Sequence, residues 1–256
     1  MAKKVYLHQF LSKTGEFQSK KDITDAIYRG DIKINDEVIR HPFYQFRPNL
    51  HTVYYKGKKL NYQDKDIYLI LNKPKGCLSS KLSDEDHEHG KHSVFEMLGP
   101  EIPDEVKNTL FCIGRLDEDT TGLLILTSDG DFSYKITNPN SNIPKTYAVF
   151  LERPLSKADK ENIEQGIVIK LEENGVNKPY KTKPSKLTIK SDVDVNITIT
   201  EGKKREVRRI FEAVDNRVRE LKRLSIGKLN IDDFNLEPGK YVKVEKEFLQ
   251  ERIGLK

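Results

Sequence analysis

Residues 114–130 read GRLDEDTTGLLILTSDG, and their character changes sharply along the segment. Residues 111–117, FCIGRLD, have the pattern of a strand edge, EDTTG that of a turn, and LLILT that of a strand buried on both faces. Asp117, Glu118 and Asp119 therefore lie in a connection between two core elements, where catalytic groups are often placed. Acidic residues also favour turns for conformational reasons alone, so the local pattern leaves open whether any of the three does chemistry.

The chain on either side of this segment predicts a mixed α and β domain. Ser128-Asp129-Gly130 is typical of a tight turn, and Asp131 is placed to cap a short helix that ends before Pro139. Upstream, an apolar strand is expected over residues 67–71 and ends at KPKG, residues 73–76. Short strands and helices alternate from there to about residue 245, without a glycine fingerprint for nucleotide binding or a repeat of fixed period.

Residues 1–60 predict a separate compact unit. Leu7, Phe10 and Leu11 have helical spacing, and Ser19 begins a second helix that Gly30 ends. The runs IKI and EVI around Asn-Asp then predict a hairpin over residues 32–39. The polar residues 61–66, NYQDKD, are expected to form a linker.

Length and composition restrict the class of protein. A chain of 256 residues buries enough core to fold without disulfides, and its two cysteines form no CxxC motif or metal-ligand spacing. No apolar run approaches the roughly 20 residues of a membrane-spanning helix, and the start lacks a signal-peptide core. We therefore expect a cytoplasmic protein without a membrane partner.

Positive charge is concentrated in two regions. Residues 1–60 carry 12 Lys and Arg against 6 Asp and Glu, and residues 202–228 carry 10 against 4, so each region has a net charge of +6 while the whole chain has +5. Two basic regions on an otherwise acidic chain suggest a polyanionic ligand bound at two places. Solvated lysine-rich faces would give the same count, so charge alone does not decide.

Residues 82–92, LSDEDHEHGKH, contain three histidines among acidic residues. Their spacing invites a metal site, but no further histidine or cysteine lies nearby in the sequence to complete a tetrahedral shell. We interpret the segment as a surface loop and expect no metal.

The order of elements in residues 1–60 resembles the alpha-L RNA-binding module of a small-subunit ribosomal protein and of several RNA-modifying enzymes. The resemblance implies RNA contacts from Lys20 and Lys21 at the start of the second helix. Positions of the first helix that are usually basic in that family are Tyr6 and Gln9 here.

The segment GRLDEDTTGLLILTSDG itself resembles the signature of the pseudouridine synthases of the Rsu/Rlu type. Three further motifs of that family accompany it in the expected order: KPKG (73–76) before it, and KTYAV (145–149) and EGKKREVRRIFEAV (201–214) after it. The C-terminal motifs are most similar to those of members that act on small-subunit ribosomal RNA. The resemblance maps the family's aspartate onto Asp117, and we expect Glu118 and Asp119 to be solvated.

The implied reaction cuts the bond between uracil nitrogen and ribose, turns the base and rejoins it through carbon 5. Nothing is oxidised and no group leaves the RNA, so no cofactor is expected. Asp117 could add to the base, add to the anomeric carbon, or abstract a sugar proton, and the sequence does not choose among these. A nearby cation would be needed to keep it ionised, because burial raises a carboxyl pKa.

The resemblance assigns that cation to Arg208. Val207, Ile210, Phe211 and Val214 have the spacing of an amphipathic helix, which would place Arg208 beside the buried stripe. We expect a bidentate pair between Arg208 and Asp117; on its own, the arginine would be interpreted as a surface residue.

A base within structured RNA must be flipped out to react, and the resemblance assigns roles in that step to two residues. Tyr147 would stack on the flipped base, although a tyrosine in such a strand is also typical of a core, and Arg115 would fill the gap left behind. The candidate phosphate contacts are Lys73, Lys145, Lys203, Lys204 and Arg205.

These observations predict an α+β protein with an alpha-L module at residues 1–60, a linker at 61–66, a catalytic domain with a mostly antiparallel sheet at 67–248 and a tail at 249–256. The expected activity is isomerisation of uridines in ribosomal RNA, free or in a ribosome assembly intermediate, by a monomer. The alternatives are a non-catalytic RNA-binding assembly factor and the same chemistry on large-subunit ribosomal RNA or transfer RNA.

Overall fold

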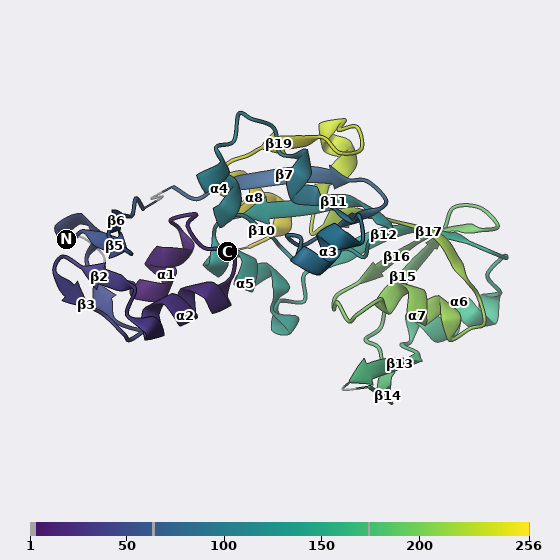
Figure 1. The fold of residues 1–256 in the computed structure, drawn as a ribbon. Helices are drawn as coiled ribbons and strands as arrows, with labels where there is room; N and C mark the ends of the chain where they lie inside the picture. The colour runs from purple at the N-terminus through teal and green to yellow at the C-terminus, as the bar shows by residue number, and fades with distance from the viewer. Residues whose placement is uncertain (1–3, 63–64, 174, 256) are drawn as a thin grey trace. The chain divides into compact units, whose positions relative to one another are not determined.

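The computed structural model describes residues 4–62, 65–173 and 175–255 (Figure 1). The chain divides into two compact units. The first comprises Met1–Ile67 and Leu98–Phe111, and the second comprises Tyr68–Met97 and Cys112–Lys256. None of the described helices is both long enough and apolar enough to span a bilayer.

The described residues of the first unit form three short α-helices, the 3-10 helix η1 (Pro48–Leu50) and two small antiparallel sheets. The α-helices are α1 (Leu7–Ser12), α2 (Lys20–Arg29) and α4 (Asp104–Thr109). The larger sheet has the strand order β3-β2-β5-β6, and β1 pairs with β4. The strands are β1 (Val5–Tyr6), β2 (Ile32–Ile34), β3 (Glu37–Val38), β4 (Gln45–Phe46), β5 (Val53–Tyr55) and β6 (Lys58–Lys59).

Local sequence signals explain the helices and the hairpin of the first unit. The Ser19 side chain accepts a hydrogen bond from the Asp22 amide at 3.1 Å, and Gly30 ends α2 with a left-handed φ of 82°. Asn35, with φ 54°, makes the turn between the paired strands β2 and β3. The buried residues of α1 and α2 share one apolar cluster with Ile32 and Ile34 of β2. These predictions are confirmed.

The segment Leu98–Phe111 joins the first unit although it lies within the range predicted for the catalytic domain. It packs tightly there, because a Cβ atom added at Gly15 would lie 2.1 Å from the Glu105 carbonyl oxygen. Residues 63 and 64 of the predicted linker lie outside the described residues. At its end, Asp66 forms a 2.9 Å ion pair with Lys13.

A nine-stranded sheet forms the centre of the second unit (Figure 1). Its main path is β15-β16-β12-β17-β11-β7-β19, while β10 pairs with β11 and β18 with β17. The strands are β7 (Tyr68–Lys73), β10 (Phe111–Cys112), β11 (Thr120–Thr127), β12 (Lys145–Leu151), β15 (Lys186–Ile189), β16 (Asp194–Ile199), β17 (Val218–Ile226), β18 (Leu229–Asn230) and β19 (Tyr241–Lys243).

The remaining elements in the described part of the second unit are two strand pairs, five α-helices and the 3-10 helices η2 (Val94–Met97), η3 (Pro139–Ser141) and η4 (Ile231–Phe234). The pairs are β8 (Cys77–Leu78) with β9 (His92–Ser93) and β13 (Val168–Glu173) with β14 (Val176–Lys181). The α-helices are α3 (Asp84–Glu88), α5 (Gly130–Thr137), α6 (Lys157–Glu164), α7 (Glu206–Glu212) and α8 (Lys246–Ile253).

Strand β11 is the apolar strand predicted from LLILT, and it lies between β7, antiparallel, and β17, parallel. The β11–β17 pair is the one parallel pair on the main path among the described strands, so the prediction of a mostly antiparallel sheet is confirmed. Gly122 lets β17 approach closely: its φ is +98°, and a Cβ atom there would lie 2.3 Å from the Arg223 carbonyl oxygen.

Two local predictions in the second unit were wrong. Asp129, not Asp131, caps α5, and its carboxylate accepts the Phe132 amide at 2.9 Å. The predicted tail at residues 249–256 is largely the helix α8, whose Leu249 and Ile253 are buried in the core against the sheet. Contacts over long sequence separation, which no local pattern reveals, accompany both outcomes: polar contacts from Tyr68 and Lys246 at Asp129, and hydrophobic packing at α8.

Candidate active site

The turn that carries the three acidic residues is fixed by hydrogen bonds to the segment that follows β7. Ser79 Oγ donates to the Leu116 carbonyl at 2.8 Å and accepts the Leu116 amide at 3.2 Å. The Gly76 amide donates to the Glu118 carbonyl at 2.8 Å, and within the turn the Thr120 amide donates to the Asp117 carbonyl at 3.0 Å. The turn is therefore held from both sides.

Lys73 is a structural part of this turn, which corrects its prediction as a phosphate contact. Its side chain is fully buried, and Nζ donates to the carbonyls of Pro74, Glu118 and Thr120 at 3.0, 3.2 and 2.9 Å. Burial lowers the pKa of Lys73. All three ammonium hydrogens are used within the protein, so this side chain cannot reach a phosphate without leaving its site.

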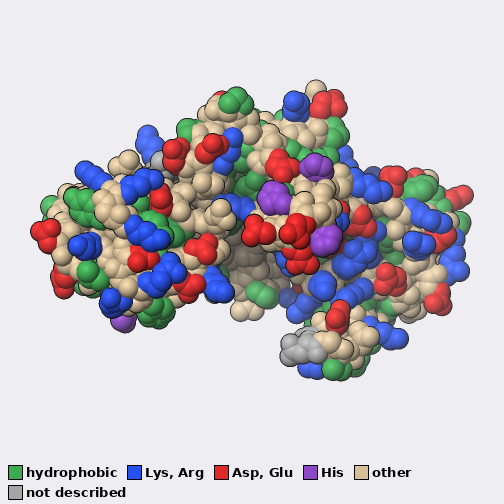
Figure 2. Space-filling view, viewed as in Figure 1, with side chains coloured by type: hydrophobic (Ala, Val, Ile, Leu, Met, Phe, Trp, Pro, Cys, Tyr) green, Lys and Arg blue, Asp and Glu red, His purple; other side chains and the backbone are tan. Residues whose placement is uncertain are grey.

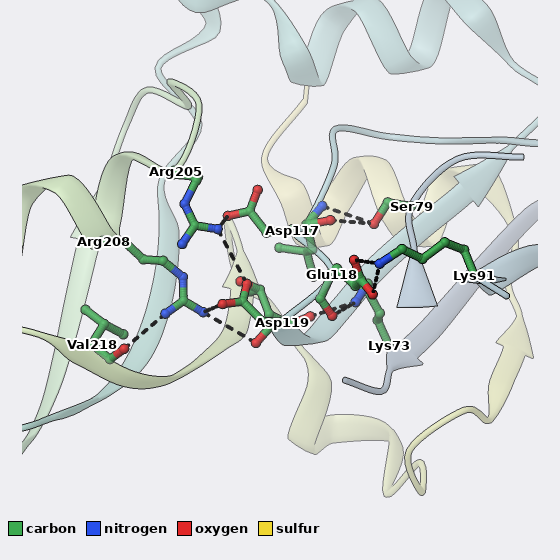
Figure 3. Close-up of polar contacts among 11 residues, drawn as sticks. Lys73, Ser79, Lys91, Asp117, Glu118, Asp119, Arg205, Arg208 and Val218 are labelled. Atoms are coloured by element: carbon green, nitrogen blue, oxygen red, sulfur yellow. Dashed lines mark hydrogen bonds and ion pairs between the residues drawn. The ribbon is translucent and has the colours of Figure 1, made fainter. Parts of the chain in front are cut away.

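Helix α7 places two arginines at the acidic turn (Figure 3). Arg208 is 5% exposed; it donates to the Val218 carbonyl at 3.1 Å and forms a 2.8 Å ion pair with Asp119. Arg205, which immediately precedes the helix, lies 3.6 Å from Asp117 and 3.7 Å from Asp119. The fold thus brings residues more than 80 positions apart into one cluster of two cations and two carboxylates.

The expected pair between Arg208 and Asp117 is corrected by this geometry. Arg208 pairs with Asp119, and the cation beside Asp117 is Arg205. The reason is the backbone at the helix start: Arg205 has a left-handed φ of 53° and precedes the first turn, so its side chain extends to Asp117 as well as to Asp119. Arg208, one turn later, is inside the fold and pairs with Asp119.

Glu118 and Asp119 are solvent-accessible, with side chains 40% and 42% exposed, and each also pairs with a cation. Glu118 points away from the arginines and pairs with Lys91, whose Nζ lies 2.9 Å from each carboxylate oxygen (Figure 3). Asp119 is held by Arg208, and its side chain is 42% exposed. Glu118 is therefore paired outside the arginine cluster, whereas Asp119 pairs closely with Arg208 and shares Arg205 with Asp117.

Asp117 combines solvent access with a nearby cation. Its side chain is 35% exposed, and the ion pair that joins it to Arg205 is, at 3.6 Å, longer than a close hydrogen bond. A carboxylate in this setting can approach a substrate as nucleophile or as base without first breaking a strong contact.

Tyr147 and Arg115 lie in contrasting environments. Tyr147 is 8% exposed and lies in β12, in register with Ile197 on one side and Arg223 on the other. Arg115 is exposed, two residues before Asp117 on the same turn. The tyrosine is thus mostly within the core of the sheet, and the arginine is free to meet a large ligand.

The other predicted RNA contacts differ in their access to solvent. Lys145 is half-buried, donates to the Ile143 carbonyl at 3.4 Å, and has a pKa lowered by burial and by Arg223. Lys203 and Lys204 are exposed beside Arg205: the Lys203 Nζ lies 4.7 Å from the centroid of the Tyr180 ring, and Lys204 lies 3.9 Å from Glu172. Lys20 and Lys21, the first two residues of α2 in the first unit, are exposed.

Charged side chains are segregated on the second unit. Acidic and histidine side chains gather over α3, and Lys and Arg side chains lie next to them on the side toward α7 (Figure 2). No cluster of three or more potential metal ligands occurs among the described residues. The predicted surface loop at residues 82–92 contains the short helix α3, which Ser83 and Asp86 close with a capping box.

Sequence reasoning missed several residues that support the site. Lys91 and Ser79 lie in segments without a recognisable motif, and only their contacts to the turn identify them. Arg223 is 3% exposed and donates through Nε to the Leu123 carbonyl at 2.7 Å. Arg223 lies two residues after Leu221 in β17, so the two side chains point to the same, buried face of the strand. This spacing is the one signal in the sequence that could have indicated a buried arginine.

Comparison with known proteins identifies the class. The model of the RNA pseudouridylate synthase family matches residues 67–213, and this chain belongs to that family. The matched range contains the acidic turn, Tyr147 and both arginines. The chain is therefore an isomerase of the pseudouridine synthase class.

Individual relatives span nearly the whole chain. It is 35% identical to the uncharacterized RNA pseudouridine synthase YtzG of Bacillus subtilis, with 95% of this chain and 96% of the relative covered. It is also 35% identical to the ribosomal small subunit pseudouridine synthase A of Salmonella typhimurium, over 84% of this chain and 86% of the relative. A crystal structure of a pseudouridylate synthase matches with a TM-score of 0.65 and 31% identity, covering 97% and 99% of the two chains.

Proposed function

We propose that this protein converts one or a few uridines of small-subunit ribosomal RNA to pseudouridine, with Asp117 as the essential carboxylate. The observation that carries the proposal is the pairing of a solvent-accessible Asp117 with Arg205 on a turn fixed by buried hydrogen bonds. The ribosomal substrate is inferred from relatives such as the small-subunit enzyme of Salmonella typhimurium.

Arg115 and Tyr147 would have roles in flipping the target base out of the RNA. Arg115, exposed beside Asp117, is suited to occupy the gap left by the extruded base. Tyr147 would stack on the flipped uracil, and stacking of this kind contributes about 1–3 kcal/mol per base. Because Tyr147 is 8% exposed, a small movement of the neighbouring side chains must accompany entry of the base.

The exposed cations Lys203 and Lys204 would contact phosphates near the target, and Lys20 and Lys21 would do so from the first unit. We propose that the enzyme acts as a monomer in the cytoplasm, on free ribosomal RNA or on an assembly intermediate. Both described cysteines are free thiols, in keeping with a reducing compartment.

Tritium release tests this function. Ribosomal RNA transcripts labelled at carbon 5 of uridine should lose tritium with the wild-type protein, and carbodiimide mapping should locate the product in small-subunit RNA. Salt-dependent binding without tritium release would favour the alternative of a non-catalytic assembly factor. Tritium release from large-subunit or transfer RNA alone would support the proposed reaction but contradict small-subunit rRNA as its substrate.

A further inference from the structure

Two carboxyl side chains are buried at the base of α7, outside the set of residues assigned above. Glu201, which follows β16, is 7% exposed, and Glu206, the first residue of α7, is 3% exposed. They flank the basic segment 202–205. A buried carboxyl group is expensive unless hydrogen bonds or a proton compensate it, so each oxygen needs a partner.

Glu201 is surrounded by donors. Its Oε1 accepts the Lys183 amide at 2.7 Å, and its Oε2 accepts the hydroxyl of Tyr180, which lies near the end of β14. Burial alone would raise the pKa of Glu201, but the hydrogen bonds from Tyr180 and from the Lys183 amide hold it below its ordinary value. Glu201 is therefore the ionised member of the pair.

Glu206 has the opposite environment. Its Oε2 accepts the Lys203 amide at 2.7 Å, but Oε1 is buried, and no donor among the described residues reaches it. Burial and the neighbouring Glu201 carboxylate raise the pKa of Glu206 to about 8. A protonated Glu206 removes the difficulty, because its hydroxyl then donates to Glu201 and needs no donor itself.

We propose that Glu201 and Glu206 are positioning residues that share one proton at neutral pH, and that the hydrogen bond between them fixes the start of α7. From that start, Arg205 and Arg208 reach the acidic turn that carries Asp117. The pair would thus set the position of both arginines without touching the substrate. This role rests on the proposed function, whereas the shared proton does not.

Nearby lysines favour ionisation of the two carboxyl groups, but they do not bring the pKa of Glu206 back to its ordinary value. Lys145 faces Glu206, and Lys183 faces Glu201; both favour the ionised carboxylates. The Lys203 ammonium lies over the Tyr180 ring rather than on either carboxylate. The pKa of Lys145 is itself lowered by burial and by Arg223, which weakens its influence on Glu206.

The shared proton predicts a pH dependence with a definite sign. Above pH about 8, Glu206 ionises and two buried carboxylates repel each other, so the arginines shift and activity falls. The folded chain also binds a proton at Glu206 that the unfolded chain has lost once the pH exceeds the ordinary value of 4.5. The contribution of Glu206 to stability therefore decreases as the pH rises from 4.5 to about 8.

The test uses Glu206→Gln, Glu206→Ala and the matched control Glu212→Gln on the exposed end of the same helix. Glutamine supplies a permanent donor to Glu201 and still accepts the Lys203 amide. Glu206→Ala should lower kcat for tritium release from the small-subunit transcript by about 10- to 100-fold, with KM nearly unchanged. Glu206→Gln should restore most of that loss and remove the alkaline fall near pH 8, while Glu212→Gln keeps the wild-type profile.

Unfolding temperatures of the full chain provide the readout that does not depend on activity. Relative to Glu206→Gln, the wild type should lose stability between pH about 5 and about 8. If the difference in unfolding temperature between wild type and Glu206→Gln stays constant over this range, the two glutamates do not share a proton. If kcat falls above pH about 8 in the same way in wild type and in Glu206→Gln, the pair does not position the arginines. If the wild type releases no tritium from any RNA, the proposed function and the positioning role fail, and the stability profile still decides on the shared proton.

Discussion

At the scale of single residues, Arg205 and Arg208 differ in how they neutralise the acidic turn. Arg208 is buried and holds Asp119 and the Val218 carbonyl, whereas Arg205 is exposed and lies beside Asp117. The resemblance predicted that Arg208 pairs with Asp117 at the turn, and the structure places Arg208 at the turn but on Asp119. The sequence could not predict which arginine meets which acid, because that depends on the left-handed backbone at Arg205.

Replacing each arginine by alanine should separate their contributions to stability. Arg208→Ala leaves the Val218 carbonyl and Asp119 without their donor, and we expect a loss of about 1–3 kcal/mol in the free energy of unfolding. Arg205→Ala removes two long, exposed ion pairs, each worth less than about 1 kcal/mol. Urea unfolding measures both, and equal losses would contradict the division of roles.

Lys73→Met tests whether this lysine holds the turn or contacts RNA. Methionine fills a similar volume but donates nothing to the three carbonyls, so we expect a loss of about 1–3 kcal/mol in unfolding free energy and a lower kcat. RNA affinity should be unchanged, as measured by filter binding. Lys75→Met, at an exposed neighbour, is the matched control. A weaker affinity without loss of stability would restore the phosphate role.

At the scale of elements, local patterns predicted β11, α2 and the first hairpin, because side-chain periodicity and turn residues determine them. They misplaced the cap of α5, because Asp129 and Asp131 are both plausible caps in sequence. Packing decided for Asp129, whose Oδ2 also accepts Tyr68 Oη and Lys246 Nζ, each at 2.6 Å. Those partners lie 61 and 117 positions away and leave no local signal.

Asp129→Ala should therefore destabilise the protein and change its response to acid. We expect a loss of about 2–4 kcal/mol at neutral pH, from the cap and from the two unpaired donors. Burial opposes ionisation of Asp129, but hydrogen bonds from Lys246 and Tyr68 lower its pKa. The stability it contributes is present above the unfolded-state pKa and is lost as the pH falls through the folded-state value.

Thermal unfolding across the acidic range measures this difference. The gap between wild type and Asp129→Ala should narrow as the pH falls, and Asp131→Ala, on the exposed side of the same helix, should remain within about 0.5 kcal/mol of wild type at every pH. A gap that stays constant down to strongly acidic pH would show that the carboxylate charge contributes nothing.

At the scale of the whole molecule, the sequence predicted two units and placed the site in the second. It could not predict that Leu98–Phe111 clusters with the first unit, because that depends on contacts such as that between Gly15 and Glu105, 90 residues apart. The resemblance to a known family supplied the catalytic roles. Without the resemblance, the sequence pattern predicts three acidic residues in a turn but not which of them is catalytic.

The two basic regions predict how the molecule binds RNA. The double variant Lys20→Gln/Lys21→Gln should weaken rRNA binding and reduce the slope of log affinity against log salt by about 1–2, since each phosphate contact contributes about 0.7–0.9. The kcat at saturating RNA should not change. Lys186→Gln/Lys190→Gln, also exposed, should leave the slope as in wild type. An unchanged slope in the first variant would exclude the first unit's lysines from the interface.

Asp117 alone among the three acidic residues is expected to carry the chemistry. The most direct measurement is single-turnover tritium release from carbon 5 of uridine in small-subunit rRNA, with Asp117→Asn compared to Glu118→Gln. Asparagine keeps the shape but can act neither as nucleophile nor as base, so release should fall by about 100-fold or more, while Glu118→Gln stays within a few fold of wild type. Full activity in Asp117→Asn, with its fold intact by circular dichroism, would contradict the assignment.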